Sequence, residues 1–484
     1  MKKTHKTVVA GVAVVALSAA IGVLIYGARL VAIGAAYKAK VICSGMFVSH
    51  REIRSLLDTD ASADDLAMLR HIDVRVDRNS REVTAEFFGL ARRTAVFRPG
   101  LGCAILPPGA VRSALPGAGG PSQGQGDRKA VIDSLAIADK ACTSIDRSRL
   151  DAAMKWALSE TEPALPRRTR AVVVVHKGRL VAEGYAHGFA KDTPLVGWSM
   201  TKSVINALVG VLANTGKISL DDSVPIPEWR GSDDPRRNVT WNQLLRMTSG
   251  LQFDENYGNP FADVTHMLLG VPDAAAYAAA KRLEAEPGTR WSYSSGTTNI
   301  IAYAMRQIVG DADYLEFPRR ALFDRLGMTS AVMETDAAGT FVGSSFMYAT
   351  ARDWARFGLL YLHDGVWDGR RILPEGWVAY ARSPGLRVPD QPYGAHFWLR
   401  IPKEYRCGSD VLPLPGDTFH AIGYEGQFIT IIPSRELVLV RLGATHYPCA
   451  WDHERFVHWV LQAIADEKPA DSAIQGMRQN TARP

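Results

Sequence analysis

The sequence predicts an α+β fold in which an antiparallel sheet is flanked by helices and a mainly helical region is inserted between its strands. Two β-rich runs meet at Lys177-Gly178 and form a predicted hairpin that begins near Ala171. Near the other end, the runs FITIIP and LVLVRL form a second hairpin, and a helix follows over residues 453–466. The chain between the hairpins is mainly helical, so the sheet is built from distant segments.

Composition and charge are those of a folded protein without a nucleic-acid partner. The chain has 484 residues, of which 47% are hydrophobic and 22% are charged, and these values exclude global disorder. The net charge is +6, but the 56 Lys and Arg residues are interspersed with 50 Asp and Glu residues. Because no basic stripe forms, we expect neither DNA nor RNA as a partner.

The amino end predicts a membrane anchor or a signal segment. Lys2, Lys3 and Lys6 precede an uncharged, mostly apolar stretch at residues 7–28, which is long enough to span a bilayer. A cleavable signal peptide normally has a shorter apolar region, so an uncleaved anchor is favoured. Small residues near Ala32 keep cleavage open.

Charges beyond this stretch bear on its orientation. The positive-inside rule compares the basic residues on the two sides of a span. On the far side these are Arg29, Lys38 and Lys40, which nearly equal the leading lysines in number, so the rule only weakly favours one orientation. We expect the bulk of the chain to be exported. The expected protein therefore crosses a bacterial inner membrane once, with its main domain in the periplasm, or is released if the segment is cleaved.

The chain divides into segments of different composition. The membrane segment at 1–28 is followed by a small accessory region at 29–106, a Gly- and Pro-rich linker at 107–130, a main domain at 146–466 and a flexible tail at 467–484. The accessory region alternates short apolar runs with charged stretches, which indicates strands and turns.

Five cysteines fit an exported protein. Cys43 and Cys103 flank one segment, Cys407 and Cys449 flank another, and Cys142 is left over. Buried free thiols are an equally good interpretation. Neither pair has the spacing of metal ligands, so we expect no metal.

The segment S-M-T-K, from Ser199 to Lys202, opens a predicted helix whose apolar residues recur from Val204 to Leu212. Residues three apart share a helix face, so Lys202 lies beside Ser199. Burial and the helix dipole both favour loss of the ammonium proton, which makes Lys202 a base that activates the serine hydroxyl. The alternative is a capping serine and a solvated lysine.

Two further motifs carry chemistry. The sequence Y-S-S, from Tyr293 to Ser295, follows a turn and opens another apolar helix, where a phenol can relay protons. The sequence H-A-I-G-Y-E-G-Q begins at His420 and leads into the strand FITIIP. Gly423 permits close approach of the backbone, and an amide there can join that of Ser199 in binding an oxyanion. Taken singly, these motifs are a capped core tyrosine and a β-turn.

In order and approximate spacing, the three motifs resemble those of the β-lactamase and penicillin-binding family over roughly residues 165–465. Within that family the chain is most similar to the class C β-lactamase-related esterases and amidases, especially the 6-aminohexanoate-dimer hydrolase group. Supporting stretches are W-S-M-T-K-S, G-K-I-S-L-D-D, L-L-R-M-T-S-G-L and P-G-T-R-W-S-Y-S-S.

The resemblance implies a β-lactamase/transpeptidase-like fold and a serine hydrolase that acts on a small-molecule ester or amide without a cofactor. Carried over by motif, Ser199 is acylated, and Lys202 and Tyr293 exchange protons with it. The backbone amides of Ser199 and Tyr424 form the oxyanion hole.

Two departures from the family pattern concern the substrate. Ser295 stands where the family has the asparagine of Y-x-N, and Ala421 and Ile422 replace the lysine and the hydroxyl residue of K-T-G. The expected substrate-binding residues are therefore Ser295, Gly423 and, as partial compensation for the lysine, His420. A charge-assisted contact between that lysine and a substrate carboxylate is worth roughly 1.5 to 3 kcal/mol. Its loss should weaken β-lactam turnover by around one to two orders of magnitude.

Two other functions stay open. One is a cell-wall DD-peptidase or transpeptidase, and the other is a non-catalytic, membrane-anchored binding module suggested by the altered third motif. Trp198, Trp291 and Trp398 belong either to the core or to the pocket. Three residues, Asp254, Glu255 and Tyr257, lie in a polar turn after T-S-G-L, where they could contact substrate.

Overall fold

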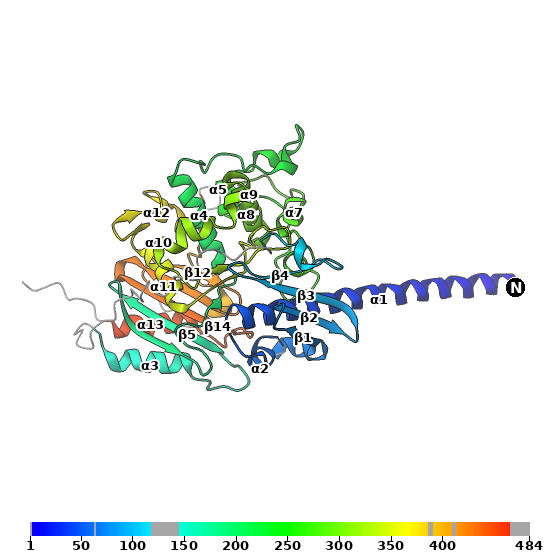
Figure 1. The fold of residues 1–484 in the computed structure, drawn as a ribbon, viewed down its shortest axis with the longest axis horizontal. Coiled ribbons are helices and arrows are strands. Elements are labelled where there is room, and N and C mark those ends of the chain that lie inside the picture. Colours follow the sequence, from blue (N-terminus) through cyan, green and yellow to red (C-terminus); the bar gives the residue numbers. More distant parts are fainter. Residues whose placement is uncertain (1, 62–63, 118–144, 386–390, 409–412, 465–484) are drawn as a thin grey trace, which may run out of the picture.

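The computed structural model describes residues 2–61, 64–117, 145–385, 391–408 and 413–464 (Figure 1). Its largest sheet has the strand order β12-β13-β14-β5-β6, and every neighbouring pair is antiparallel. The strands are β5 (Thr169–His176), β6 (Arg179–Tyr185), β12 (Phe419–Gly423), β13 (Gln427–Ile432) and β14 (Leu437–Gly443). Segments from both ends of the main domain thus form one sheet, which confirms the predicted α+β class.

Local backbone conformation explains both hairpins of this sheet. Between β5 and β6, Lys177 and Gly178 have φ angles of 50° and 69°, and two left-handed residues match the twist of antiparallel strands. Between β13 and β14, a short 3₁₀ turn at Pro433–Arg435 ends at Glu436, whose φ is 46°. Because these signals are local, both hairpins were predictable from sequence.

Helices cover both faces of the sheet. On one face, α3 (Arg147–Leu158) packs with α13 (His453–Ala463). On the other face, α11 (Ala351–Leu362) contacts β13 and β14. Elsewhere between β6 and β12 lie the helices α4 (Met200–Asn214), α5 (Trp241–Leu245), α6 (Asp263–Leu269), α7 (Ala274–Ala279), α8 (Ser295–Val309), α9 (Asp311–Tyr314), α10 (Asp324–Leu326) and α12 (Trp377–Ala381). The short strands there are β7 (Leu195–Val196), β8 (Val332–Met333), β9 (Met347–Ala349), β10 (Val366–Trp367) and β11 (Arg370–Arg371).

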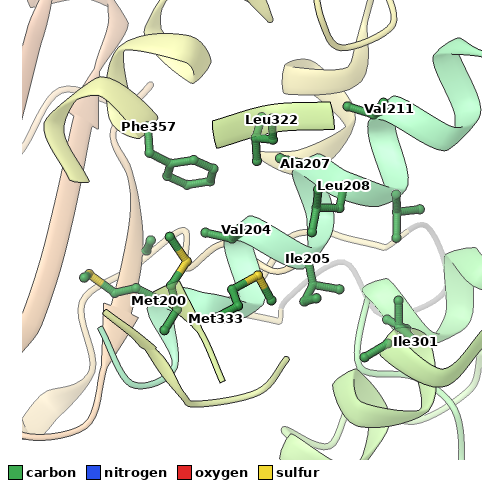
Figure 2. Close-up of a cluster of buried hydrophobic side chains, with 14 of the residues drawn as sticks. Met200, Val204, Ile205, Ala207, Leu208, Val211, Ile301, Leu322, Met333 and Phe357 are labelled. Carbon is green, nitrogen blue, oxygen red and sulfur yellow. The ribbon is translucent and has the colours of Figure 1, made fainter. Parts of the chain in front are cut away.

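Helix α4 runs through the centre of the inserted region. Its apolar side chains, including Val204 and Leu208, are fully buried and pack beside Leu322 and Phe357 (Figure 2). Polar anchors hold the same helix, because the Asn206 amide oxygen accepts hydrogen bonds from Tyr361 at 2.6 Å and from Trp377 at 2.9 Å. Packing on all sides therefore fixes the first turn of α4.

The amino end of the chain is one long helix, α1 (Lys2–Phe47), which continues well past residue 28. Its first half extends away from the rest of the protein (Figure 1), and its second half packs on a sheet of order β1-β2-β3-β4. These strands are β1 (Asp73–Asp77), β2 (Glu82–Phe87), β3 (Leu90–Arg98) and β4 (Gly102–Ile105), and the one-turn helix α2 (Ile53–Leu56) lies beside α1. Among the described helices, α1 alone is long and apolar enough to cross a membrane, within Leu17–Phe47.

Covalent and polar contacts join this accessory region to its surroundings. The disulfide Cys43–Cys103 ties α1 to β4, and Cys407–Cys449 joins two loops of the main domain. Lys40 forms a fully buried ion pair with Glu334 of the main domain. Cys142, most of the predicted linker and the predicted tail lie outside the described residues.

Candidate active site

Ser199 occupies the N-cap position of α4, but its side chain makes no capping hydrogen bond. Instead its hydroxyl accepts a hydrogen bond from the Lys202 Nζ atom at 2.9 Å. The preceding residue, Trp198, has a left-handed φ of 46°, which costs a non-glycine residue energy and turns the chain sharply into the helix. The serine is therefore presented at a strained turn with its hydroxyl directed at a base.

Lys202 is completely buried, and its ammonium is fully hydrogen-bonded. Besides Ser199, it donates to Ser295 Oγ at 2.9 Å and to the Ser344 carbonyl oxygen at 3.0 Å. Burial lowers the pKa of Lys202 to about 8, while the negative charge of Glu255 acts in the opposite direction. A lysine with this pKa exchanges protons near neutral pH.

Tyr293 lies directly against this pair. The Lys202 Nζ atom is 4.9 Å from the centroid of the Tyr293 ring. Burial raises the pKa of the Tyr293 phenol well above its usual value, and a hydrogen bond with Ser199 opposes this shift. The phenol is therefore protonated at neutral pH and can donate a proton.

Ser295 and Glu255 extend the hydrogen-bonded chain away from Lys202. The Ser295 hydroxyl donates to Glu255 Oε1 at 2.5 Å, and its backbone N–H donates to Glu255 Oε2 at 2.7 Å. Burial raises the pKa of Glu255, and the Lys202 charge lowers it. Sequence reasoning placed Ser295 and Glu255 on the substrate, whereas these bonds direct both toward the lysine. Ser294, not Ser295, caps α8.

A histidine that sequence reasoning missed holds the main chain of Lys202. His396 Nδ1 lies 2.9 Å from the Lys202 carbonyl oxygen, and its Nε2 lies 3.3 Å from Thr298 Oγ1. Burial lowers the pKa of His396 to about 3, so the imidazole is neutral and serves as a hydrogen-bonding support for the first turn of α4. No local motif marks it.

The end of β12 packs on the turn that carries the nucleophile. A Cβ atom on Gly423 would lie only 2.1 Å from the Gly197 carbonyl oxygen, so only glycine permits this approach. The next residue, Tyr424, stacks on Tyr257 with ring centroids 4.8 Å apart. The structure thus brings Gly423 and Tyr424 beside Gly197 and Trp198, the residues that precede Ser199.

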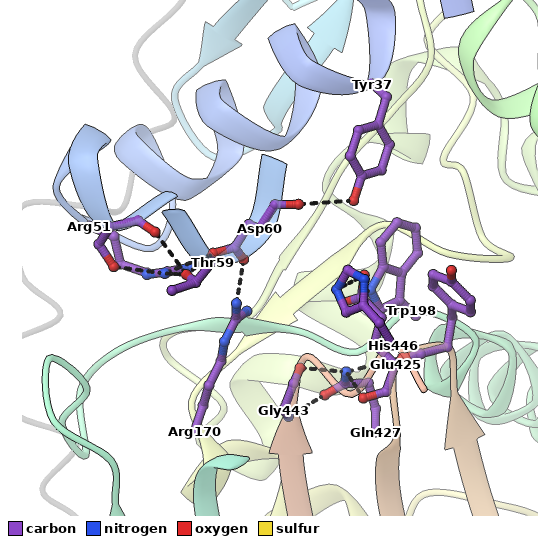
Figure 3. Close-up of polar contacts among 12 residues, drawn as sticks. Tyr37, Arg51, Thr59, Asp60, Arg170, Trp198, Glu425, Gln427, Gly443 and His446 are labelled. Atoms are coloured by element: carbon purple, nitrogen blue, oxygen red, sulfur yellow. Dashed lines mark hydrogen bonds and ion pairs between the residues drawn. The ribbon is translucent and has the colours of Figure 1, made fainter. Parts of the chain in front are cut away.

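Side chains from the two turns also hold each other (Figure 3). Trp198 Nε1 donates to Glu425 Oε2 at 3.2 Å, and His446 Nε2 lies 3.6 Å from Glu425 Oε1. Like Trp198, Glu425 has a left-handed φ, of 62°. The Gln427 amide donates to the carbonyl oxygens of Tyr424 and Gly443. We call Trp198 and Glu425 the tryptophan–glutamate clamp, because it joins the residue before Ser199 to the residue after Tyr424.

The structure does not bring His420 to this site. Its Nδ1 lies 2.9 Å from Thr430 Oγ1, which in turn lies 2.7 Å from His453 Nε2 of α13. Successive residues of a strand point to opposite faces, so His420 projects toward α13 while Ala421 and Gly423 project toward α4. His420 therefore cannot compensate for the lysine that is missing at Ala421.

Two of the three tryptophans form an aromatic wall beside Tyr293. The Trp398 ring centroid is 5.3 Å from that of Tyr293, and Trp291 packs on Trp398 at 6.3 Å. Trp198 belongs to the clamp instead and packs on Phe346 at 5.7 Å. The two rings give the surroundings of Tyr293 a largely apolar character.

Comparisons with known proteins agree with this geometry. Residues 160–459 match the sequence model of the family described as Beta-lactamase. The 6-aminohexanoate-dimer hydrolase of Paenarthrobacter ureafaciens is 27% identical over 336 residues, which cover 64% of this chain and 80% of the relative. A penicillin-binding protein homolog from Caulobacter crescentus has a similar structure, with a TM-score of 0.50, 18% identity, and coverage of 66% of this chain and 97% of that one. The hydrolase EstCE1 gives a TM-score of 0.50 at 15% identity, covering 66% and 98%.

Proposed function

The chain belongs to the β-lactamase family and is a serine hydrolase, and we propose that it cleaves an ester or amide bond through an acyl-enzyme formed on Ser199. The observation that carries the proposal is the buried Lys202 Nζ atom 2.9 Å from the Ser199 hydroxyl. A serine hydroxyl is a weak nucleophile until a neighbouring base removes its proton. Lys202 is within hydrogen-bonding distance and has a pKa suited to that task.

In the acylation step, neutral Lys202 takes the hydroxyl proton as Ser199 Oγ attacks the carbonyl carbon. The developing oxyanion is held by the backbone N–H groups of Ser199 and Tyr424. These donors are fixed by the fold, so they need not reorient as the charge develops. The tetrahedral intermediate then collapses, the bond to the leaving group breaks, and Tyr293 donates its proton to that group. The proton on Lys202 returns to the Tyr293 oxygen, so both residues are reset.

Deacylation repeats these steps with water as the nucleophile. Water loses a proton to the Lys202–Tyr293 pair, attacks the acyl carbon, and Ser199 leaves as a hydroxyl once it regains a proton. Ser295 and Glu255 keep the lysine in place through both steps, because the Ser295 hydroxyl accepts a hydrogen bond from the Nζ atom and donates one to Glu255. No cofactor takes part in this scheme.

The proposed substrates are small-molecule esters or amides. Ala421 replaces the cation that would bind a β-lactam carboxylate, and His420 faces away. Ser295, whose hydroxyl is engaged by Glu255, contributes at most its remaining hydrogen-bonding capacity to substrate, while Gly423 lets the strand end approach the Gly197 carbonyl oxygen. A relative named for an amide substrate, the 6-aminohexanoate dimer, supports amides beside esters. We therefore propose an esterase or amidase with weak β-lactam turnover.

The proposed location is the bacterial inner membrane, with α1 as a single span and the main domain in the periplasm. The apolar surface of α1 between Leu17 and Leu30 is exposed, as expected for a helix surrounded by lipid. Two disulfides, Cys43–Cys103 and Cys407–Cys449, fit an oxidising compartment. Together these features support export of the main domain.

A fluorophosphonate probe tests the proposed nucleophile. The probe should label the wild-type protein covalently, and Ser199→Ala should abolish labelling. Ser295 also accepts a hydrogen bond from Lys202, but its hydroxyl donates to Glu255, so we expect it not to replace Ser199 as the labelled residue. Absence of labelling in the folded wild type would favour a non-catalytic binding module. A panel of p-nitrophenyl esters, aryl amides, nitrocefin and a D-Ala-D-Ala peptide then identifies the substrate class, and preferential cleavage of the peptide would favour a DD-peptidase.

The rate of hydrolysis should depend on pH through Lys202. Only the neutral amine acts as a base, and burial lowers the pKa of Lys202 to about 8. Below this pH the neutral fraction falls about tenfold per unit, so kcat/KM for a neutral ester should rise with pH and level off above about 8. Initial rates between pH 5.5 and 9.5, corrected for spontaneous hydrolysis, measure the profile. A flat profile would contradict the role of the lysine.

The tryptophan–glutamate clamp should affect the rate more than substrate binding. Trp198→Phe keeps a ring but removes the indole N–H that donates to Glu425. Because the oxyanion amides flank the clamp, we expect kcat to fall about tenfold with KM little changed. Trp367→Phe on the distant strand β10 is the matched control. A raised KM with normal kcat would instead assign Trp198 to the substrate pocket.

A further inference from the structure

The accessory sheet runs along α1 in a defined direction. At one end, the Lys38 Nζ atom donates to the carbonyl oxygens of Leu69 and Ile72, each at 2.8 Å, immediately before β1 begins. At the other end, the disulfide Cys43–Cys103 ties α1 to the start of β4. Because Asp73 pairs with Glu86, the turn from β2 to β3 lies beyond the first end. That turn therefore points toward the amino-terminal half of α1, and the turn from β1 to β2 points the opposite way.

The two turns differ sharply in polarity. In the turn from β2 to β3, Phe88 is 79% exposed and Leu90 is 68% exposed. Met68, one residue before the Lys38 contact at Leu69, is 78% exposed. The opposite turn reads R-N-S-R at residues 78–81. Large apolar side chains are thus exposed at the end of the sheet that faces the amino-terminal half of α1.

Helix α1 is largely exposed over the same region. Tyr26 is 57% exposed and Leu30 is 38% exposed, whereas Ala35 and Ala39 are fully buried. The uncharged stretch at residues 7–28 is about 33 Å long at 1.5 Å per residue, which equals the hydrocarbon thickness of a bilayer. If lipid covers this stretch, the surface of the bilayer falls between the exposed and the buried parts of α1.

Charges at this boundary suit phospholipid headgroups. Arg29 is exposed and follows the uncharged stretch directly. The Arg92 side chain, two residues after Leu90, is 63% exposed, and its Nε atom donates to Glu86 Oε2 at 2.9 Å. Arginine beside exposed aromatic and aliphatic side chains is the composition of a membrane interface. Both residues lie close to the point where protein begins to cover α1.

We propose that Phe88, Leu90 and Met68 form a lipid-contacting surface that inserts into the interfacial layer of the membrane spanned by α1. Arg29 and Arg92 bind the phosphates of anionic lipids beside it. The turn from β2 to β3 points toward the exposed half of α1, so this inference rests on the proposed membrane location. A second contact joins the main domain to α1 near the same boundary.

That contact comes from the loop that carries Glu255 and Tyr257. At its end, Phe261 packs on Tyr26 of α1 with ring centroids 4.3 Å apart. The inserted turn on one side and the Phe261 contact on the other fix the main domain around α1. The active-site loop is consequently held at the membrane surface instead of turning freely on a single helix.

The depth of a fluorescent label in the full chain tests this surface. In a Cys142→Ser background, Phe88→Cys and, separately, Asn79→Cys of the opposite turn are labelled with an environment-sensitive dye. Each protein is reconstituted into vesicles of phosphatidylcholine and phosphatidylglycerol that contain doxyl-labelled lipid. The label at position 88 should shift to shorter wavelength and lose more than half of its intensity, while the label at position 79 should behave as in water. Equal behaviour of the two labels would overturn the proposal.

A second measurement separates this inference from the proposals on which it rests. Carbonate extraction reports whether α1 anchors the chain, and hydrolysis of p-nitrophenyl acetate reports activity. If the chain stays in the vesicles and hydrolyses ester but position 88 remains in water, the surface alone is wrong. Release by carbonate would overturn the anchor and the surface together. Phe88→Ser combined with Leu90→Ser should keep both anchoring and activity, and should abolish the quenching of a label placed at position 89 through Gly89→Cys.

Discussion

Replacing Lys202 by methionine is expected to lower kcat/KM for a small ester by about 10²- to 10⁴-fold while the protein remains folded. Methionine is similar in length to lysine and suits the buried position, but it cannot accept the Ser199 proton. The loss should appear in the acylation step, so the rate of labelling by a fluorophosphonate should fall in parallel. Steady-state kinetics and the thermal melting temperature measure the two effects independently.

The matched control for this substitution is Lys191→Met, which replaces an exposed lysine outside the site. It should leave both the rate and the melting temperature within experimental error. Near-normal hydrolysis by the Lys202→Met protein would exclude the lysine as the base. The melting temperature shows whether a loss of activity in Lys202→Met comes from unfolding. If it does, Lys202→Arg tests the base directly, because arginine retains a cation but cannot deprotonate at neutral pH.

Local sequence signals predicted the proximity of Ser199 and Lys202 because the geometry of this pair is local. Ser199 and Lys202 are one helical turn apart, so the 3.6-residue period alone brings them together. The hairpin at Lys177 and Gly178 was equally predictable, because a short-range turn preference determines it. Neither inference required knowledge of how distant segments pack.

Residues that depend on distant packing were missed or misplaced. Glu255 contacts Ser295 across 40 positions, and His396 contacts the Lys202 main chain across 194, so no spacing rule links them. His420 lies one residue from the altered K-T-G position, but the alternation of side chains along β12 turns it to the other face of the sheet.

The lysines after the membrane stretch illustrate the same limit. Lys38 and Lys40 look in sequence like flanking charges that set the orientation of a span. In the structure both are buried, Lys38 on two carbonyl oxygens and Lys40 on Glu334. They stabilise the packing of α1 on its neighbours, and Arg29 is left as the exposed cation nearest the predicted membrane boundary.

Gly423→Ala is expected to lower kcat by about 10²- to 10³-fold, the cost of losing one oxyanion donor. The added methyl would lie 2.1 Å from the Gly197 carbonyl oxygen, a backbone atom that cannot rotate away, so β12 must move back from the nucleophile turn. This movement would carry the Tyr424 amide away from Ser199 without altering any side chain that transfers protons.

The consequence is a distinctive kinetic pattern, in which the rate falls while the pH dependence set by Lys202 stays the same. Gly416→Ala is the matched control, since a Cβ atom at Gly416 meets nothing within 4 Å, and it should leave kcat unchanged. If Gly423→Ala retained full activity with an intact fold, the strand end would not supply the oxyanion donor. A shifted pH profile would instead mean that the methyl had displaced the base, and the oxyanion role would have to be assigned elsewhere.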